Sequence, residues 1–598
     1  MQLIFIVNFI LSGMLSTVYK TDIVIFQAST GGTTAAIESA RHGSDVILLE
    51  PHDWLGGMLT SAGVSAVDGN DQLPSGLWGE FRDSLQNHYG NKDALFTGWV
   101  SKTMFEPHVG DQIFKNICSK FPNLHIWYNT TWSTVKRIGN KWKITTKQNN
   151  QILTIYASLI IDATDMGDIA AMVGTKYDIG FERKSITGEA IALDSAVNII
   201  QDLTYVAILK DYHGQAPLVK KPDNYSISSY LCSCDTFDCN EKKHTCSSML
   251  NYGKLPNDKY MINWPIHGND FYDNLIEKDE IERQKVILNA KNHTLGFIYF
   301  IQHDLGWRHL GLADDEFKTK DLLPYIPYYR EGRRIHGLSR LTMNHAFNPF
   351  ATPEALYRTG IAVGDYPVDH HHGSNTNVPK LDYVPIPSFN VPLGCLIPDG
   401  VDGLILADKA ISVSNIMNGA TRLQPVILQV GQAAGLLASQ SIKNKTSPAS
   451  IPIRDIQQIL IKEKMYTLPY LDVKPTDLDF EVIQKIGLTG ILRGKGLSKG
   501  WSNETWFYPD SLLSTNEFIK GYNDFYKSMP IHQLNITTKC VNKDVLIKLS
   551  PILKNNPNQF DGDIYEPMTK REIAVWINKN WKPFEKYKVK WNGMVVPN

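Results

Sequence analysis

The stretch from Thr21 to Glu50 constrains the fold of this chain more than any other segment. Residues 22–26 form a short apolar run, residues 33–42 are Ala-rich with helical spacing and Gly43 follows them, and residues 46–49 form a second apolar run. This order predicts strand, turn, helix and strand. An acidic residue about 20 positions beyond the turn is typical of a βαβ unit that binds a dinucleotide. In such units the helix start holds the pyrophosphate and the carboxylate accepts ribose hydroxyl hydrogen bonds.

The glycine pattern of this unit is incomplete. The G-x-G-x-x-G motif would occupy positions 27, 29 and 32, but Gln27 and Ser29 replace the first two glycines and only Gly32 remains. A side chain at a positive φ angle costs on the order of 1 kcal/mol. Ser29 offers a hydroxyl that can donate to a phosphate, whereas Gln27 offers no evident compensation. Glu50 is the candidate ribose acceptor, and a structural salt bridge is its alternative role.

Length and charge limit the class of protein. With 598 residues, the chain is too long for one core, so two to four domains are expected. A net charge of -1 and a pI near 7.0 give no reason to expect nucleic acid or an anionic membrane as a partner. The predicted partner is a small-molecule substrate.

The first residues indicate entry into the secretory pathway. Residues 3–15 are apolar and of signal-peptide length, although a basic start is missing, so we expect a signal peptide over residues 1–19. A buried first strand is the alternative. No later segment resembles a membrane span, which predicts a secreted, extracellular protein without stable membrane insertion. Sequons that permit glycosylation stand at Asn129, Asn224, Asn292, Asn444, Asn503 and Asn535.

Four of the seven cysteines lie close together in the chain. They are Cys232, Cys234, Cys239 and Cys246. In a secreted protein this cluster favours two local disulfides that staple a loop. A zinc site is the alternative, but the C-x-C-x4-C-x6-C spacing matches no familiar zinc pattern, so no metal is expected.

Later segments are predicted to return to the nucleotide unit. Gly56 and Gly57 would let the backbone run close to a large flat ligand. An apolar strand at 159–162 leads into a polar turn, and another at 403–406 ends near Asp408. The predicted domains are 20–180 (first part of the cofactor domain), 181–345 (substrate or cap domain), 346–443 (return of the cofactor domain) and 444–598 (helical C-terminal module).

The ordered set of motifs resembles the family of FAD-dependent oxidoreductases that share the glutathione-reductase nucleotide fold. The matching motifs run from DIVIF at 22–26 through LGGMLT at 55–60, FEPH at 105–108, IDAT at 161–164, NWP at 263–265, REGRR at 330–334, GDYP at 364–367 and RLQP at 422–425 to GQAAG at 431–435. The resemblance implies an α/β fold: a Rossmann-like FAD-binding domain, an interleaved α+β cap domain and a small helical C-terminal module.

The resemblance also implies FAD as the cofactor. The candidate cofactor-binding residues are Ser29, Gly31, Gly32, Glu50, Gly56, Gly57, Met58, Thr164, Asp168, Asp408 and Gln424. Asp408 stands where the family usually has a glycine near the ribityl chain, and we expect it to contact ribityl hydroxyls. The segments at 508–518 and 565–573 resemble degenerate surface-layer-homology repeats, which implies at most weak contact with a cell-wall polymer or glycan.

Three residues are candidates for catalysis. His370 or His371 is the predicted base that takes a substrate proton, or the site of a covalent flavin link; a solvated His-rich loop is the alternative. Arg333, beside Arg334, is predicted to hold a substrate carboxylate or the pyrophosphate, or to pair with neighbouring acids.

The sequence thus predicts a secreted FAD-dependent oxidoreductase. A hydride would pass from a small organic substrate to the flavin, with oxygen or another acceptor reoxidising it. Two alternatives remain. The glycine losses suit a catalytically degenerate flavoprotein-fold glycoprotein with a binding or structural role. A NAD-binding protein is disfavoured by the second glycine pair and by the extracellular context.

Overall fold

The computed structural model describes residues 17–238, 244–373, 375, 377–527, 536, 538–550 and 563–596. Most of the predicted signal peptide, Cys239 and Asn535 lie outside these ranges. None of the described helices combines the length and the apolarity that a membrane span requires.

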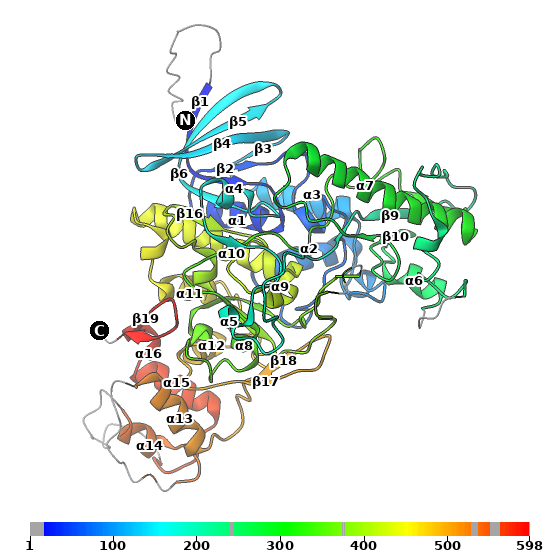
Figure 1. Ribbon diagram of the computed structural model, residues 1–598. Helices are drawn as coiled ribbons and strands as arrows, with labels where there is room; N and C mark the ends of the chain where they lie inside the picture. The colour runs from blue at the N-terminus through cyan, green and yellow to red at the C-terminus, as the bar shows by residue number, and fades with distance from the viewer. Residues whose placement is uncertain are drawn as a thin grey trace.

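A seven-stranded sheet forms the centre of the cofactor domain (Figure 1). Its order is β3-β2-β1-β6-β5-β4, and β16 pairs with β6. Five strands pair in parallel, as βαβ connections require: β3, β2, β1, β6 and β16. Strand β5 pairs antiparallel with both β6 and β4. The strands are β1 (Thr17–Phe26), β2 (Val46–Leu49), β3 (Leu124–Trp127), β4 (Thr130–Ile138), β5 (Lys141–Gln148), β6 (Gln151–Asp162) and β16 (Leu404–Leu406).

The long strand β6 allows β5, and through it β4, to join the main sheet. Along one edge, β6 pairs with β1 over residues 153–162. Along the other edge it pairs first with β5 over residues 151–157 and then with β16 over residues 160–162. Because β6 is 12 residues long, both partners fit on that edge, and β4 and β5 extend the main sheet.

Helices α1 (Thr30–Arg41) and α10 (Gln424–Asn444) pack together below the sheet (Figure 1). Gly431 and Gly435 on α10 allow this close approach. A Cβ atom at Gly431 would lie 2.2 Å from the carbonyl oxygen of Gly31, and one at Gly435 would lie 2.3 Å from that of Ala35. α2 (Gly76–Tyr89) and α3 (Pro107–Cys118) complete the layer.

The cap domain contains a three-stranded sheet, β10-β9-β12, and the long helix α7. The bounds are β9 (Ala207–Asp211), α6 (Cys246–Tyr252), β10 (Lys259–Ile262), α7 (Glu280–Tyr299) and β12 (Leu310–Leu312). α7 begins at residue 280 because Asp279 and Glu282 form a capping box there.

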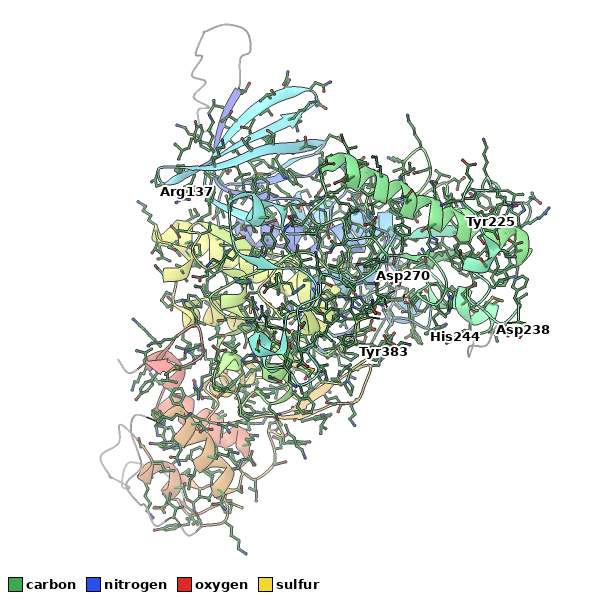
Figure 2. The ribbon with its side chains drawn as sticks, in the orientation of Figure 1. Arg137, Tyr225, Asp238, His244, Asp270 and Tyr383 are labelled. Atoms are coloured by element: carbon green, nitrogen blue, oxygen red, sulfur yellow. A yellow bond between two sulfur atoms is a disulfide. The ribbon has the colours of Figure 1, made fainter. Side chains whose placement is uncertain are left out.

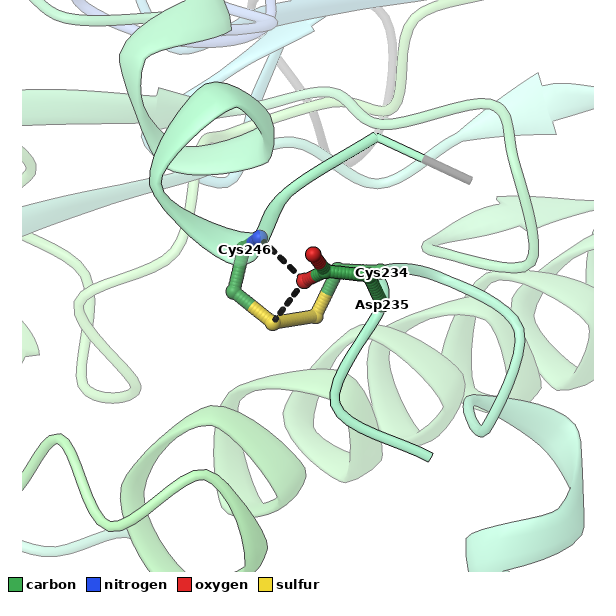
Figure 3. Close-up of side chains that lie close together, drawn as sticks. All are labelled: Cys234, Asp235 and Cys246. Carbon is green, nitrogen blue, oxygen red and sulfur yellow. Dashed lines mark hydrogen bonds between the residues drawn. A yellow bond between two sulfur atoms is a disulfide. The ribbon is translucent and has the colours of Figure 1, made fainter. Parts of the chain in front are cut away.

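One predicted disulfide is present in the cap. Cys234 and Cys246 are joined, with their Cα atoms 4.9 Å apart, and the backbone N–H of Cys246 donates to Asp235 at 3.2 Å (Figure 3). The bond ties the start of α6 to the preceding loop. The second predicted disulfide involves Cys239, which lies outside the described residues, so it stays a prediction.

The chain then returns to the main sheet and ends in helices that pack around a second apolar cluster, which Leu73 and Val363 join. Ser514 caps α13 and Thr569 forms a capping box at α15, so the segments at 508–518 and 565–573 each lead into a capped helix. The elements are β14 (Gly360–Gly364), β15 (Phe389–Pro392), α9 (Asn415–Thr421), α11 (Ile453–Lys462), α12 (Phe480–Thr489), α13 (Thr515–Phe525), α14 (Lys543–Lys548), α15 (Lys570–Asn580) and α16 (Pro583–Lys586).

Short elements complete the chain. They are α4 (Asp168–Met172), β7 (Tyr177–Asp178), α5 (Lys184–Thr187), β8 (Leu203–Thr204), β11 (Asp270–Phe271), β13 (Arg334–Ile335), α8 (Met343–Phe347), β17 (Lys495–Leu497), β18 (Glu504–Trp506), β19 (Lys588–Val589) and β20 (Val595–Val596).

Candidate functional site

The turn between β1 and α1 folds as its sequence predicts. Ser29 is the N-cap of α1, and its Oγ accepts from the backbone N–H of Gly32 at 3.1 Å. Gly32 has no room for a side chain, since a Cβ there would lie 2.1 Å from the carbonyl oxygen of Gln27. Gln27 itself adopts a φ of 73°, the conformation for which the lost glycine would be suited.

The second glycine pair lies against the start of α1. Gly56 and Gly57 have φ angles of 102° and 55°, and a Cβ at Gly57 would lie 2.5 Å from the Cα of Ser29. The hydroxyl of Thr30 donates to the carbonyl of Gly56 at 2.7 Å. Met58, the next predicted cofactor residue, is buried. The two predicted glycine motifs therefore form one continuous backbone surface.

Glu50 lies at the carboxyl end of β2, beside this surface. Its Oε2 accepts from the backbone N–H of Ala28 at 2.7 Å, and its Oε1 accepts from that of His52 at 3.0 Å. Burial raises the pKa of Glu50 to about 8, although the two backbone N–H groups act in the opposite direction. The carboxyl group is thus well placed to hydrogen-bond a ribose hydroxyl.

The N-terminus of α1 already binds an anionic oxygen. Asp408 follows β16, and its Oδ2 accepts from the backbone N–H of Gly31 at 2.9 Å. Helix N-termini bind anions because their N–H groups are unpaired and the helix dipole is positive there. The carboxylate oxygen stands in for a phosphate oxygen, so the donor chemistry of this site fits a pyrophosphate.

A second group of charged residues surrounds His371. The His371 Nδ1 atom lies 2.8 Å from Oδ2 of Asp270, and its Nε2 atom lies 3.4 Å from Oδ2 of Asp369. The guanidinium of Arg330 also contacts Asp270, at 3.1 Å. Burial and Arg330 oppose protonation of His371, but the two carboxylates outweigh them and raise its pKa. The two acids therefore favour the imidazolium form of His371.

The same carboxylates titrate well below their ordinary range. Arg330 and His371 overcome the effect of burial and hold the pKa of Asp270 well below its usual value. Burial raises the pKa of Asp369, but His371 and Arg422 lower it to about 2. Both acids are therefore ionised at neutral pH and are unsuited to accept a substrate proton.

Asp68 differs from these acids. Burial raises its pKa to about 7, while Arg422 and His371 lower it and Asp369 raises it further. Its Oδ1 is buried and accepts no hydrogen bond within the part of the chain that the structure describes. An acid with a pKa near neutrality and a free oxygen has the properties of a general base.

Arg422 lies near Asp68, whose pKa its charge lowers, and it bonds a phenol. One guanidinium nitrogen of Arg422 donates to the Tyr328 hydroxyl at 2.6 Å, and another donates to the backbone carbonyl of Asp369 at 3.0 Å. This arginine can hold a substrate oxygen or carboxylate beside Asp68. We refer to Asp68, Asp369, His371 and Arg422 as the charged cluster.

The charged cluster and the start of α1 lie along the same helix. Gln424, at the first turn of α10, donates to the carbonyl of Ala66 at 2.9 Å and so lies beside Asp68. Further along α10, Gly431 contacts Gly31. These two points of α10 are about 10 Å apart at about 1.5 Å per residue. An extended dinucleotide that begins at Gly31 can therefore reach the charged cluster.

Three aromatic rings lie close together near the charged cluster, since the charges of Asp369 and Asp68 act on Tyr383. The ring centroids of Tyr366 and Tyr383 each lie 5.2 Å from that of Trp501. Tyr366 is buried, whereas Tyr383 and Trp501 are exposed. Figure 2 labels Tyr383 and Asp270 in the region between the cap and the rest of the chain. Exposed aromatic faces beside charged groups suit the entry of a small organic molecule.

The structure separates His370 from His371. His370 is buried; its Nδ1 lies 3.2 Å from Nε2 of His372, and a Cβ at Gly419 would lie 2.4 Å from its ring. Burial lowers the pKa of His370 well below the ordinary value. Neighbours in an extended chain point to opposite sides, so only His371 faces the two carboxylates.

Other predicted site residues make structural contacts. Arg333 contacts Asp168 at 2.8 Å and Glu277 at 3.0 Å, so it lies with Asp168 and not with His371. Arg283 binds Asp168 as well. Thr164 accepts from the backbone N–H of Asp168 at 2.8 Å and supports the turn after β6.

Sequence reasoning missed Asp68, Arg330, Arg422 and Tyr328 as site residues. Asp68 precedes a glycine in a loop and carries no local motif. Arg330 is the first residue of the REGRR motif, and Arg422 is the first residue of the RLQP motif. Their places in these family motifs were the sequence signal that could have identified them.

A family model described as FAD dependent oxidoreductase matches residues 22–460. This range includes the βαβ unit, the cap and the charged cluster. No curated protein sequence matches the chain.

Three solved structures of other proteins are similar to this chain at low identity. Anhydrotetracycline hydroxylase from Streptomyces rimosus is 9% identical, with a TM-score of 0.32, and the match covers 78% of this chain and 70% of that one. p-Nitrophenol 4-monooxygenase from Pseudomonas putida is 11% identical, with a TM-score of 0.26, over 54% and 70%. L-proline dehydrogenase from P. horikoshii is 15% identical, with a TM-score of 0.17, over 28% of this chain and 26% of that one.

Proposed function

The chain belongs to the family of FAD-dependent oxidoreductases, and we propose that it oxidises a small organic substrate at the charged cluster. FAD is the cofactor, as the sequence predicted. The observation that carries the proposed reaction is Asp68, whose pKa is raised to about 7 beside Arg422 and His371. Oxidation of an alcohol or amine needs a group that accepts the proton while the hydride leaves.

The residues at the start of α1 would hold the cofactor. The N–H of Gly31 would bind a pyrophosphate oxygen, Glu50 would hydrogen-bond the ribose, and the backbone at Gly56 and Gly57 would lie alongside. When bound, FAD supplies a hydride acceptor.

The charged cluster would carry out the proton transfer. For an alcohol, Asp68 accepts the hydroxyl proton as the C–H bond breaks, the hydride leaves and a carbonyl forms. Arg422 holds the substrate oxygen, and His371, whose two ring nitrogens face Asp270 and Asp369, contributes positive charge beside it. Asp270 and Asp369 keep His371 charged and correctly oriented. Oxygen, as the final acceptor, takes up two electrons and two protons to give hydrogen peroxide.

We also propose that the protein is secreted. The apolar run at residues 3–15 and the disulfide between Cys234 and Cys246 support this. Outside the cell no NAD(P)H pool is available, which favours an oxidase or dehydrogenase over a reductase. Expression in a secreting cell line tests the proposal: N-terminal sequencing of protein from the medium should start near residue 20. Retention of the full-length chain inside the cells would argue against secretion.

A screen of purified protein loaded with FAD tests the proposed reaction. Sugars, polyols, amines and phenols would be offered, and hydrogen peroxide release measured. With an accepted substrate, Asp68→Asn and His371→Gln should each lower kcat by about 10²-fold or more. Asp71→Asn, in the same loop, is the control and should retain activity. Unchanged kcat in Asp68→Asn would refute Asp68 as the base.

A degenerate glycoprotein with a binding or structural role is the second candidate. It is favoured by the contact of Asp408 with Gly31, which places a carboxylate where a phosphate would bind. The absorbance spectrum separates the candidates. Purified, FAD-incubated protein that shows the visible bands of oxidised flavin supports the enzyme. Folded protein that stays colourless at saturating FAD supports the second candidate.

A further inference from the structure

Two positions where the chain departs from the family pattern belong to one side-chain network. Gln27 replaces a glycine of the β1–α1 turn, and Asp408 replaces the glycine expected after β16. These positions are far apart in the chain, yet Asp165 and Lys409 connect their side chains. We call Gln27, Asp165, Asp408 and Lys409 the plug.

The contacts of the plug are short and buried. The side-chain amide of Gln27 donates to Oδ2 of Asp165 at 2.7 Å. Nζ of Lys409 lies 2.5 Å from Oδ1 of Asp165 and 2.8 Å from Oδ1 of Asp408. The other oxygen of Asp408 accepts from the N–H of Gly31 at 2.9 Å. The side chains of Lys409 and Asp408 are fully buried and that of Asp165 is 5% exposed.

The backbone of the plug is held in an unfavourable conformation. Gln27 has a φ of 73° and Asp408 a φ of 80°, where a residue with a side chain costs on the order of 1 kcal/mol relative to its preferred conformation. The hydrogen bonds and ion pairs of the plug must offset that cost. Both side chains therefore contribute to holding the conformation that places Asp408 on the N-terminus of α1.

The plug and a pyrophosphate compete for the same donor. A backbone N–H makes one strong hydrogen bond, so the N–H of Gly31 can bind Asp408 or a phosphate oxygen. The two anions also repel each other. At about 4 Å that repulsion is on the order of 1 kcal/mol in water and on the order of 4 kcal/mol near a protein surface. Lys409 is the cation of the plug and is already shared by Asp165 and Asp408.

We propose that Asp408 is an internal competitor for the pyrophosphate of FAD, so that FAD binds only after the Asp408 carboxylate leaves the N–H of Gly31. This inference rests on the proposed cofactor site at the start of α1 but not on any reaction at the charged cluster. In the open form, Lys409 remains beside Asp165 and is free to pair with a phosphate. The observed Kd equals the intrinsic Kd divided by the fraction of open protein, so the plug weakens FAD binding.

Removal of the competing carboxylate is the direct test. Glycine suits the φ of 80° at position 408, so Asp408→Gly should fold and should bind FAD at least about tenfold more tightly than the wild type. ADP, which carries the pyrophosphate, should show the same gain, whereas riboflavin, which has no phosphate, should show none. Asp402→Gly, an exposed acid at the other end of β16, is the matched control and should leave all three affinities unchanged. Equal FAD affinity in wild type and Asp408→Gly, or weaker binding in the variant, would overturn the proposal.

Hydrogen exchange gives a readout that needs no cofactor. In the ligand-free protein, the amide of Gly31 is bonded to Asp408 and should exchange slowly; in Asp408→Gly it should exchange faster. Asp408→Asn keeps an oxygen acceptor but removes the charge, so its FAD affinity should lie between those of wild type and Asp408→Gly. Slow exchange at Gly31 in all three proteins would show that Asp408 does not protect it. A protein that binds FAD as described but oxidises no substrate would refute the proposed function and leave the plug intact.

Discussion

Nδ1 of His371 lies 2.8 Å from Oδ2 of Asp270, at the boundary between the cap and the cofactor domain. Asp270 also forms an ion pair with Arg330, so the carboxylate that the cap supplies is already ionised and oriented. Asp270, which belongs to the cap, therefore favours the charged form of His371, which lies in the segment that returns to the cofactor domain.

Asp270→Asn should lower the pKa of His371. Loss of the carboxylate removes one of the two groups that favour the imidazolium, while burial and Arg330 continue to oppose it. NMR titration of histidine-labelled protein should show the His371 resonance shift at a lower pH than in the wild type. Asp314→Asn, an exposed acid that pairs with Lys210, should leave this titration unchanged. An unchanged midpoint in Asp270→Asn would contradict the assigned pairing.

Asp68→Asn should stabilise the protein at alkaline pH. The folded state raises the pKa of Asp68 from 3.8 to about 7, so its favourable contribution is complete below pH 4 and is lost as the pH rises through about 7. The amide removes that loss. At pH 8 we expect the free energy of unfolding to increase by on the order of 1 kcal/mol, with little change at pH 4. Denaturant unfolding at both pH values measures this; greater stability at pH 4 alone would contradict it.

Local sequence predicted the elements well because their signals are local. The βαβ unit follows from apolar runs, helical spacing and the stop signal at Gly43, each of which acts over a few residues. The strands at 159–162 and 403–406 were recognised in the same way. The structure places both strands in one sheet, where Ile161 lies opposite Ile405.

The site was harder to predict because its key contacts join distant residues. Asp408 and Gly31 are 377 positions apart, and only the fold shows that the acid reaches the helix start instead of merely facing a ribityl chain. The pKa of Asp68 depends on burial and on charges from two other segments. Arg333 lies in the REGRR motif and forms an ion pair with Asp168, whereas Arg330, at the start of the same motif, forms an ion pair with Asp270.

Gly57→Ala should cost more than a glycine replacement at an open position. The new Cβ would lie 2.5 Å from Cα of Ser29 and 2.7 Å from the nitrogen of Thr30, at a φ of 55°. We expect a loss of about 2 to 4 kcal/mol in the free energy of unfolding, from overlap as well as conformation. Gly139 has a φ of 59° and no neighbouring atom within 4 Å, so Gly139→Ala isolates the conformational cost, about 1 kcal/mol. Equal losses of unfolding free energy in the two variants would show that the backbone at Gly57 does not pack tightly against the start of α1.

His42→Gln should destabilise the protein in a pH-dependent way. The His42 imidazole lies 3.3 Å from Glu38, one turn earlier on α1, and 3.1 Å from Glu463 after α11. These carboxylates outweigh burial and raise its pKa to about 9. The stabilising contribution is complete below about pH 6.5 and is lost as the pH rises through about 9. We expect the variant to lose about 1 to 2 kcal/mol of unfolding free energy at pH 6 and little at pH 10.

The matched control for His42 is another histidine between two acids. His213 lies 3.7 Å from Asp211 and 3.3 Å from Asp258, but its side chain is 72% exposed. Solvent screens such pairs, so His213→Gln should change the free energy of unfolding by less than about 0.5 kcal/mol at either pH. A pH-independent loss in His42→Gln would instead indicate lost packing between α1 and the end of α11. A pH-dependent loss specific to His42 would show that its imidazolium links α1 to Glu463, which follows α11.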